Sequence, residues 1–191
     1  NSFHQTGLRN LLDVAVLGYG GTNQLAALQE NYTKVDEIPF DFARRRMSVV
    51  VKPAGREEHL LVCKGAIEEV LALCASVDAN ASEEDGIEPF TREMKANVRR
   101  VTRNLNADGL RALAVAYKWL PAENRVYSIK DESELTLAGY VAFLDPPKET
   151  ARAAIAALNE HGIEVKIITG DNEVVTRKIC AEVGLPAKQA L

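Results

Sequence analysis

Two short segments near the C-terminal end of the sequence hold residue types suited to binding phosphate. In Thr169-Gly170-Asp171, a hydroxyl, a glycine and an acid follow the apolar run 165–168 and precede a helical pattern. Upstream, the segment 145–148 places two prolines between an acid and a lysine. Where a strand of a parallel sheet meets a helix, backbone N–H groups and a hydroxyl can hold a phosphate. A plain capped turn explains Thr169-Gly170-Asp171 as well, because turns of this composition are common.

The elements around these segments have the pattern of an α/β protein. Apolar residues at helical spacing predict helices at 149–161, closed by Gly162, and at 173–183, ended by Gly184. Between them, 165–168 is predicted to be a short buried strand. This α–β–α order is typical of a doubly wound parallel sheet. Since the stretch is too short to form such a sheet alone, we predict that it is a fragment of one.

Residues 1–144 show a different pattern. Their apolar positions and turn residues predict, in order, a helix at 8–17, a linker at 18–23, a helix capped by Thr22 and ending near 31, a hairpin of 47–52 with 60–63, a helix at 66–75, a helix from Thr91 to 106, a strand at 110–119, a loop at 121–134 and a strand at 135–144. This order suits an antiparallel sheet with helices on its faces, so the predicted fold class is α+β, followed by the α/β fragment. Pro146 and Pro147 restrict the backbone between the two patterns, as a hinge between domains requires.

Composition limits the classes of ligand. The net charge of -4 gives no argument for nucleic acid or an anionic membrane. The local basic spots at 44–46 and 99–100 within this acidic whole favour a small anionic ligand over a long polyanion. No apolar run approaches the ~20 residues that span a bilayer. The odd number of cysteines without C-x-x-C spacing fits a reducing compartment. We predict no metal site, buried inert thiols at Cys63 and Cys74, and surface positions for His4, His59 and His161. Because the sequence does not begin with methionine, we expect a piece of a longer protein.

Five ordered segments of the chain resemble one protein family. They are Asp13–Ala15, Ile38–Phe40 through Met47–Val49, Lys64–Ala66, Gly109–Ala114, and Asp145–Lys148 with Thr169–Asn172. In this order they resemble the nucleotide-binding (N) domain of a P-type ATPase, followed by part of its haloacid dehalogenase-like phosphorylation (P) domain. The residues at 36–42 and 143–150 resemble those of the bacterial magnesium-transporting branch of this family. The resemblance places the N domain at 1–144 and the partial P domain at 145–191.

The resemblance implies an ATP-driven cation pump, with Mg²⁺ as the expected transported ion and ATP bound as MgATP. The N domain of such a pump presents the γ-phosphate to an aspartyl nucleophile in an Asp-Lys-Thr-Gly-Thr motif. These residues contain neither that motif nor the family's Gly-Asp-Gly motif, so we expect ATP binding without turnover and no catalytic residue in the chain. The expected partners are the remaining P, A and transmembrane domains. The implied location is the cytoplasmic side of a bacterial inner membrane, without direct membrane or nucleic-acid contact.

At the adenine end of the expected site, the resemblance gives roles to five residues. Phe40 stacks on the base, Asp13 accepts a hydrogen bond from its amino group, and Lys64 lines the pocket. Gly65 and Ala66 follow, and the missing side chain of the glycine lets the ligand approach the backbone. The ordinary structural alternatives are a core aromatic, a helix-face aspartate and a solvated lysine at a strand edge.

At the phosphate end, the resemblance assigns Arg111 to the ATP phosphates, a task that suits a guanidinium fork. Arg45 is expected near the nucleotide. Arg44 and Arg46 flank it on the opposite face of the strand, where we expect them to be solvated.

The resemblance also extends the expected site to the two C-terminal segments. Asp145 and Lys148 correspond to hinge positions that touch bound nucleotide, with a more structural than catalytic role. Thr169, Gly170 and Asp171 correspond to a segment near the transferred phosphoryl group, where Thr169 resembles the phosphate-binding hydroxyl of the haloacid dehalogenase superfamily.

Other functions remain open at this point. A stand-alone haloacid dehalogenase-type phosphohydrolase would explain the Thr-Gly-Asp segment, although no D-x-D-like nucleophile is evident. A P-type ATPase for another cation would share the same segments. A regulatory or interaction module could use the predicted helix from Thr91 to Asn106, whose charges otherwise suit a solvated face. Phosphatase activity with Mg²⁺ would favour the first of these.

Overall fold

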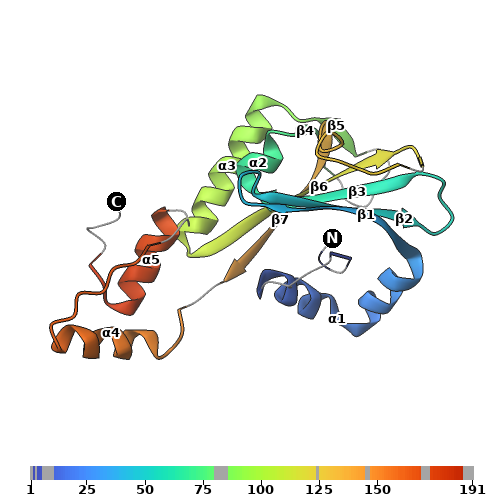
Figure 1. The fold of residues 1–191 in the computed structure, drawn as a ribbon. Coiled ribbons are helices and arrows are strands. Elements are labelled where there is room, and N and C mark those ends of the chain that lie inside the picture. Colours follow the sequence, from blue (N-terminus) through green and yellow to red (C-terminus); the bar gives the residue numbers. More distant parts are fainter. Residues whose placement is uncertain are drawn as a thin grey trace. The chain divides into compact units, whose positions relative to one another are not determined.

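The computed structural model describes residues 2, 4–5, 11–79, 86–123, 125–144, 147–168 and 173–186. Their helices and strands, labelled in Figure 1, are α1 (Leu11–Asn31), β1 (Tyr32–Asp41), β2 (Arg46–Pro53), β3 (His59–Ala66), α2 (Ile67–Leu71), β4 (Cys74–Asp78), β5 (Ile87–Pro89), α3 (Arg92–Ala107), β6 (Leu110–Leu120), β7 (Leu135–Leu144), α4 (Ala151–Glu160) and α5 (Glu173–Val183). Among these described residues, no helix is long and apolar enough to cross a membrane.

Seven strands form a sheet in the order β1-β2-β3-β6-β7-β4-β5. The pairs β1/β2, β2/β3, β3/β6 and β4/β5 are antiparallel, whereas β4 and β7 run parallel. The predicted α+β class is therefore confirmed, although the sheet is mixed and not purely antiparallel. Helix α1 lies on one side of the sheet and α2 on the other (Figure 1).

Two compact units divide the chain. The first comprises Asn1–Ala96 with Leu113–Val141, and the second comprises Asn97–Ala112 with Ala142–Leu191. The division at 144/145 that the sequence suggested follows from the family resemblance and stays a prediction.

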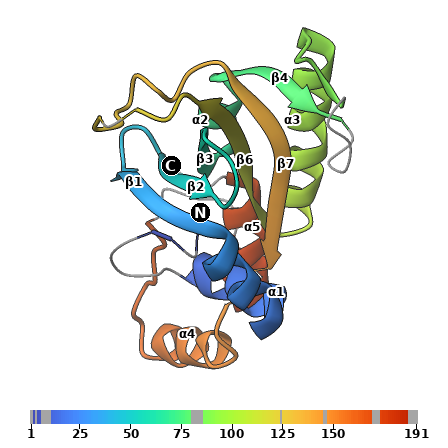
Figure 2. The same cartoon turned by 90° about the vertical axis from the view of Figure 1, so that its right-hand side faces the viewer.

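The N-terminal part of the chain differs from the prediction in two ways. Helix α1 continues through 18–23, where a linker and a new helix start were expected. Glycine inside a helix costs only about 1 kcal/mol relative to alanine, and no proline interrupts this stretch. Strand β1, which was not predicted, begins at Tyr32 and forms the edge of the sheet (Figure 2). An edge strand tolerates Pro39 because its N–H side need not pair.

The predicted hairpin is confirmed as the centre of the first unit. Strands β2 and β3 pair Val49 with Val62 and Val50 with Leu61. Val49, Val50 and Leu61 have no exposed surface. Because side chains alternate along a strand, the consecutive buried residues of β2 show that both of its faces are covered.

The helix predicted after the hairpin is shorter than expected. It was predicted at 66–75, but α2 ends at Leu71 and β4 begins at Cys74. Burial of Val70 and Leu71 satisfies the helical pattern, and the following residues pair with β5 and β7 instead. Helix α3 begins as predicted, with Thr91 Oγ1 accepting a hydrogen bond of 3.2 Å from the N–H of Met94.

The burial of two thiols predicts which cysteines react with a thiol reagent. Cys63 and Cys74 are buried, whereas Cys180 is half-buried. Burial raises the pKa of Cys63 to about 11 and that of Cys74 to about 12. The thiolate is the reactive form, so at pH 8 an aromatic disulfide reagent should titrate Cys180 promptly and the other two thiols only after unfolding. In a Cys180→Ser variant the prompt reaction should disappear; rapid labelling of Cys63 in the folded protein would contradict this.

In the second unit, the two helices predicted after residue 148 are present as α4 and α5, and Gly162 and Gly184 follow them at φ of 72° and 82°. The predicted buried strand at 165–168 is wrong: no strand is assigned there, and the Ile168 side chain is 99 % exposed. A strand needs a neighbour to pair its backbone groups. None of the strands of the described sheet pairs with this segment.

Candidate functional site

The core of the site is an ion pair between a strand and a helix. Lys64 lies in β3, opposite Met47 of β2, and Asp13 lies in the first turn of α1. The Lys64 ammonium donates to an Asp13 carboxylate oxygen, and also to Gln5 Oε1 at 2.6 Å and Ser2 Oγ at 3.0 Å. Asp13 is only 2 % exposed. The structure therefore brings together two of the predicted adenine-end residues and adds Ser2 and Gln5, which the sequence analysis missed.

Burial and pairing act in opposite directions on this ion pair. Burial lowers the pKa of Lys64 below its ordinary value, although the hydrogen bond to Asp13 works against this. Burial also pushes the pKa of Asp13 upward, but hydrogen bonds from Lys64, Ser2 and Gln5 outweigh it and hold the pKa below 3.8. A lowered carboxyl pKa means that the stability supplied by Asp13 is present at neutral pH and is lost as pH falls through that folded-state pKa.

Phe40 lies two strands away from Lys64 in the sheet. The register pairs Ile38 with Ser48 and Asp41 with Arg46, so that Pro39 and Phe40 together oppose Met47 alone. Two residues against one is a β-bulge. Met47 also pairs with Lys64 on its other side, which places Phe40 and Lys64 two strands apart, about 10 Å by the usual strand spacing.

The aromatic side chains at this edge are exposed. Phe40 is 51 % and Phe42 is 88 % exposed, and their ring centroids lie 5.2 Å apart at 87°. Phe42 lies beyond the end of β1, in the turn that leads to β2. An exposed aromatic ring can stack on a flat ligand, and Phe40 is not the core residue of the structural alternative.

Gly65 has a structural reason for being glycine. A Cβ built there would lie 2.4 Å from Arg46 Cβ and 2.6 Å from the Arg45 carbonyl oxygen. The neighbouring Ala66 N–H donates to that same carbonyl oxygen at 3.0 Å. The space left by the missing side chain is thus filled by β2 and the turn before it. This packing explains the glycine without a ligand, and the expectation that a ligand approaches the backbone here stays a prediction.

The three consecutive arginines behave differently from the prediction. Arg45 is exposed, with φ of 47°, and its guanidinium pairs with Glu69. Arg44 and Arg46, expected to be solvated, both bind the carboxylate of Glu132, at 2.7 Å from Nη1 and 2.8 Å from Nε respectively. The Glu132 carboxylate offsets positive charge of the two guanidinium groups, which therefore need not be fully hydrated.

Glu132 is a residue of the site that the sequence analysis missed. It is 2 % exposed and accepts a third hydrogen bond, 2.8 Å from Ser48 Oγ. Arg44 joins it to the bulge, since Arg44 Nη2 donates to the Pro39 carbonyl oxygen at 2.7 Å. Glu132 therefore fixes, through Arg44, the peptide unit immediately before Phe40.

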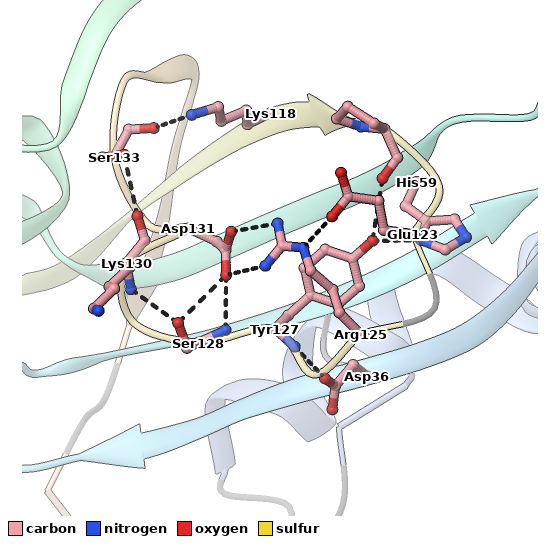
Figure 3. Close-up of polar contacts among 11 residues, drawn as sticks. Asp36, His59, Lys118, Glu123, Arg125, Tyr127, Ser128, Lys130, Asp131 and Ser133 are labelled. Carbon is pink, nitrogen blue, oxygen red and sulfur yellow. Dashed lines mark hydrogen bonds and ion pairs between the residues drawn. The ribbon is translucent and has the colours of Figure 1, made fainter.

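The loop between β6 and β7, which also carries Glu132, bonds to strands of the sheet at several points (Figure 3). Tyr127 shares a hydrogen bond of 2.7 Å with Nδ1 of His59, and its N–H donates to Asp36 at 2.8 Å. Arg125 binds Asp131 at 2.7 Å within the loop. His59 is 7 % exposed, so its predicted surface position is wrong; the tyrosine hydroxyl supplies the polar partner that a buried imidazole needs.

The remaining predicted residues are distributed as follows. Arg111 lies in β6 within the second unit, and Lys148 is exposed just before α4. Asp145 and Thr169-Gly170-Asp171 lie outside the described residues. The structure thus pairs Asp13 with Lys64, and the nucleotide-binding roles of all these residues stay predictions.

Comparison with known proteins defines the class of this chain. Residues 5–150 match the model of a family described as P-type ATPase, cytoplasmic domain N, and the chain belongs to this family. It is 51 % identical over 191 residues, all of this chain and 21 % of the relative, to the magnesium-transporting ATPase, P-type 1, of Escherichia coli (strain K12). Identity to one protein of that name from Salmonella typhimurium (strain LT2) is 53 % over 189 residues, 98 % of this chain and 20 % of the relative.

The name of a more distant relative mentions another ion. The chain is 29 % identical over 175 residues, 91 % of its length and 19 % of the relative, to a calcium-transporting ATPase of Listeria monocytogenes. The chain spans about a fifth of the length of the curated relatives it matches.

Proposed function

We propose that this chain is the ATP-binding domain of a P-type ATPase that transports Mg²⁺. The observation that carries the proposal is the half-exposed ring of Phe40 two strands from the buried Lys64–Asp13 pair, within the region that matches the family model. The higher identity to magnesium-transporting than to calcium-transporting relatives supports the choice of ion.

At the adenine end, each side chain has a role that its chemistry supports. The ring of Phe40 stacks on the base, an interaction worth about 1–3 kcal/mol per base in nucleic-acid binding proteins. Asp13 accepts from the 6-amino group, and the Lys64 ammonium donates to the adjacent ring nitrogen. Gly65 and Ala66 serve the site by holding β3 against the turn at Arg45.

The proposal assigns two arginines to the triphosphate. Arg45 is exposed and close in sequence to Phe40, and Arg111 supplies a second guanidinium. Asp145 and Lys148 act at the hinge, and the segment 169–171 approaches the transferred phosphoryl group. ATP enters as MgATP, whose metal offsets phosphate charge.

The proposed domain binds ATP, whereas phosphoryl transfer takes place elsewhere in the pump. Residues 1–144 form the N domain and 145–191 a segment of a haloacid dehalogenase-like P domain. The γ-phosphate is presented to an aspartyl nucleophile that these residues do not include. The remaining P, A and transmembrane domains complete a pump of the bacterial inner membrane, with this domain on the cytoplasmic side.

A titration with ATP tests the proposal at Phe40. An exposed stack and few phosphate contacts predict a Kd on the order of mM, roughly -4 kcal/mol. Substituting Phe40→Ala removes the stacking surface, so we expect affinity to fall about 5- to 150-fold. Amide chemical shifts during the titration measure both quantities.

The adjacent exposed ring provides the matched control. Phe42→Ala removes a similar aromatic surface outside the strand and should weaken ATP binding about threefold or less, since it loses only the edge contact to Phe40. No perturbation near Phe40, Lys64 and Arg111 at several mM ATP would contradict the proposal. Equal losses in the two variants would remove the stacking role of Phe40.

A further inference from the structure

The side chain of Gln5 completes a closed ring with the ion pair. Its Nε2 donates to Asp13 Oδ2 at 2.6 Å, and its Oε1 accepts from the Lys64 ammonium at 2.6 Å. The ammonium in turn pairs directly with Asp13. A carboxylate only accepts and an ammonium only donates, so the orientation of the amide is fixed by its partners.

This pattern matches one edge of a purine base. A carboxamide presents an NH₂ donor and an oxygen acceptor on the same carbon, about 2.2 Å apart from its bond lengths. Adenine presents its 6-amino group and ring nitrogen 1 on either side of one carbon in the same way. A base with a carbonyl at position 6 and N–H at position 1 has the reverse order.

We propose that Gln5 is an internal stand-in for adenine, holding the base-recognition pair of Asp13 and Lys64 until the nucleotide displaces it. This inference rests on the proposed ATP-binding function and deepens it, because it names the residue that sets both the affinity and the base preference of that site. Gln5 lies 8 residues from Asp13 and 59 from Lys64, so only the fold places its amide between them.

Displacement has a cost that the protein imposes on its own ligand. Asp13 is 2 % exposed and the Lys64 side chain 12 % exposed, so a base reaches their polar atoms by taking the place of the amide. The apparent Kd equals the intrinsic Kd divided by the fraction of molecules in which the pair is accessible. With that fraction at about 10–30 %, removal of the amide tightens ATP binding about 3- to 10-fold.

The test compares three forms of the 191-residue chain: unchanged, Gln5→Ala and Gln29→Ala. Gln29 is exposed on α1 and makes a matched glutamine control. We expect Gln5→Ala to bind ATP about 3- to 10-fold more tightly, and Gln29→Ala to bind it as the unchanged chain does. The affinity for inosine triphosphate, which has a carbonyl at position 6, should not increase in Gln5→Ala.

A second readout follows the amide itself. In the unchanged chain, the side-chain NH₂ resonances of Gln5 should move during the ATP titration from hydrogen-bonded toward solvent-exposed positions, while those of Gln29 stay constant. Thermal unfolding of each variant confirms that it is folded.

The outcomes separate the inference from the function on which it rests. If ATP shifts the amides near Phe40 but Gln5→Ala binds it equally or more weakly, the stand-in role is overturned and ATP binding stands. If Gln5→Ala binds inosine triphosphate more tightly by the same factor as ATP, the role of Gln5 in base preference is overturned. If ATP leaves the Phe40 region unchanged in every form, the proposed function itself fails.

Discussion

Substituting Glu132→Ala should lower the free energy of unfolding by about 3–5 kcal/mol. The carboxylate is 2 % exposed and receives hydrogen bonds from Arg44, Arg46 and Ser48. Its removal leaves two guanidinium groups, whose side chains are only 19 % and 15 % exposed, without the charge that compensates them. Because both arginines keep some contact with water, we expect the lower half of that range.

Urea unfolding of matched variants measures this effect. The control is Glu123→Ala, because the Glu123 side chain is 57 % exposed and its ion pair with Arg125 should be worth less than about 1 kcal/mol. Glu132→Gln keeps the shape and loses the charge, so it should fall between the two. Equal destabilisation by Glu132→Ala and Glu123→Ala would show that the buried network contributes nothing special.

The same substitution should disturb the site. Arg44 bonds both Glu132 and the Pro39 carbonyl oxygen, so losing the carboxylate frees the guanidinium that holds the bulge. We expect the amide resonance of Phe40 to shift in folded Glu132→Ala and to stay unchanged in Glu123→Ala.

Gly65→Ala should destabilise the domain by about 1–3 kcal/mol, the usual cost of forcing an extra methyl group into a packed position. The new Cβ would meet Arg46 Cβ at 2.4 Å and Arg46 Cα at 2.8 Å. These are backbone-proximal atoms of a paired strand, which cannot rotate away as the end of a long side chain can. Relief would require β2 and β3 to separate at the residues next to Lys64.

Gly18→Ala provides the opposite case. A Cβ at Gly18 meets nothing within 4 Å, and the residue lies inside α1, where alanine is favoured by up to about 1 kcal/mol. Both substitutions add one methyl group, and urea unfolding should give changes of opposite sign. A neutral or stabilising Gly65→Ala would contradict the packing described for this position.

Elements defined by neighbouring residues were predictable. The β2–β3 hairpin, the start of α3 at Thr91, and the strands at 110–119 and 135–144 follow from periodicity and turn chemistry. The errors fall where a local pattern has two solutions. Glycines at 18–21 permit a linker or a continuous helix, and the apolar run at 165–168 forms a strand only when another strand pairs with it.

Most polar partners of the site could not be predicted in this way. Arg44 and Arg46 were expected in water because they flank Arg45 on the opposite face of the predicted strand. Their partner Glu132 lies 88 residues from Arg44 and 86 from Arg46, in a segment that was predicted only to be a loop. Gln5 carries no motif at all, and its place beside Lys64 depends on how the N-terminal segment meets β3.

The amino-acid sequence by itself determined the family and the α+β class, because these are recorded in short segments and local periodicities. The same segments predicted Asp13, Phe40 and Lys64 as site residues. Only the tertiary structure decided which charges are buried and what compensates them. Burial and pairing depend on which distant segments meet across the sheet, and no local pattern contains that information.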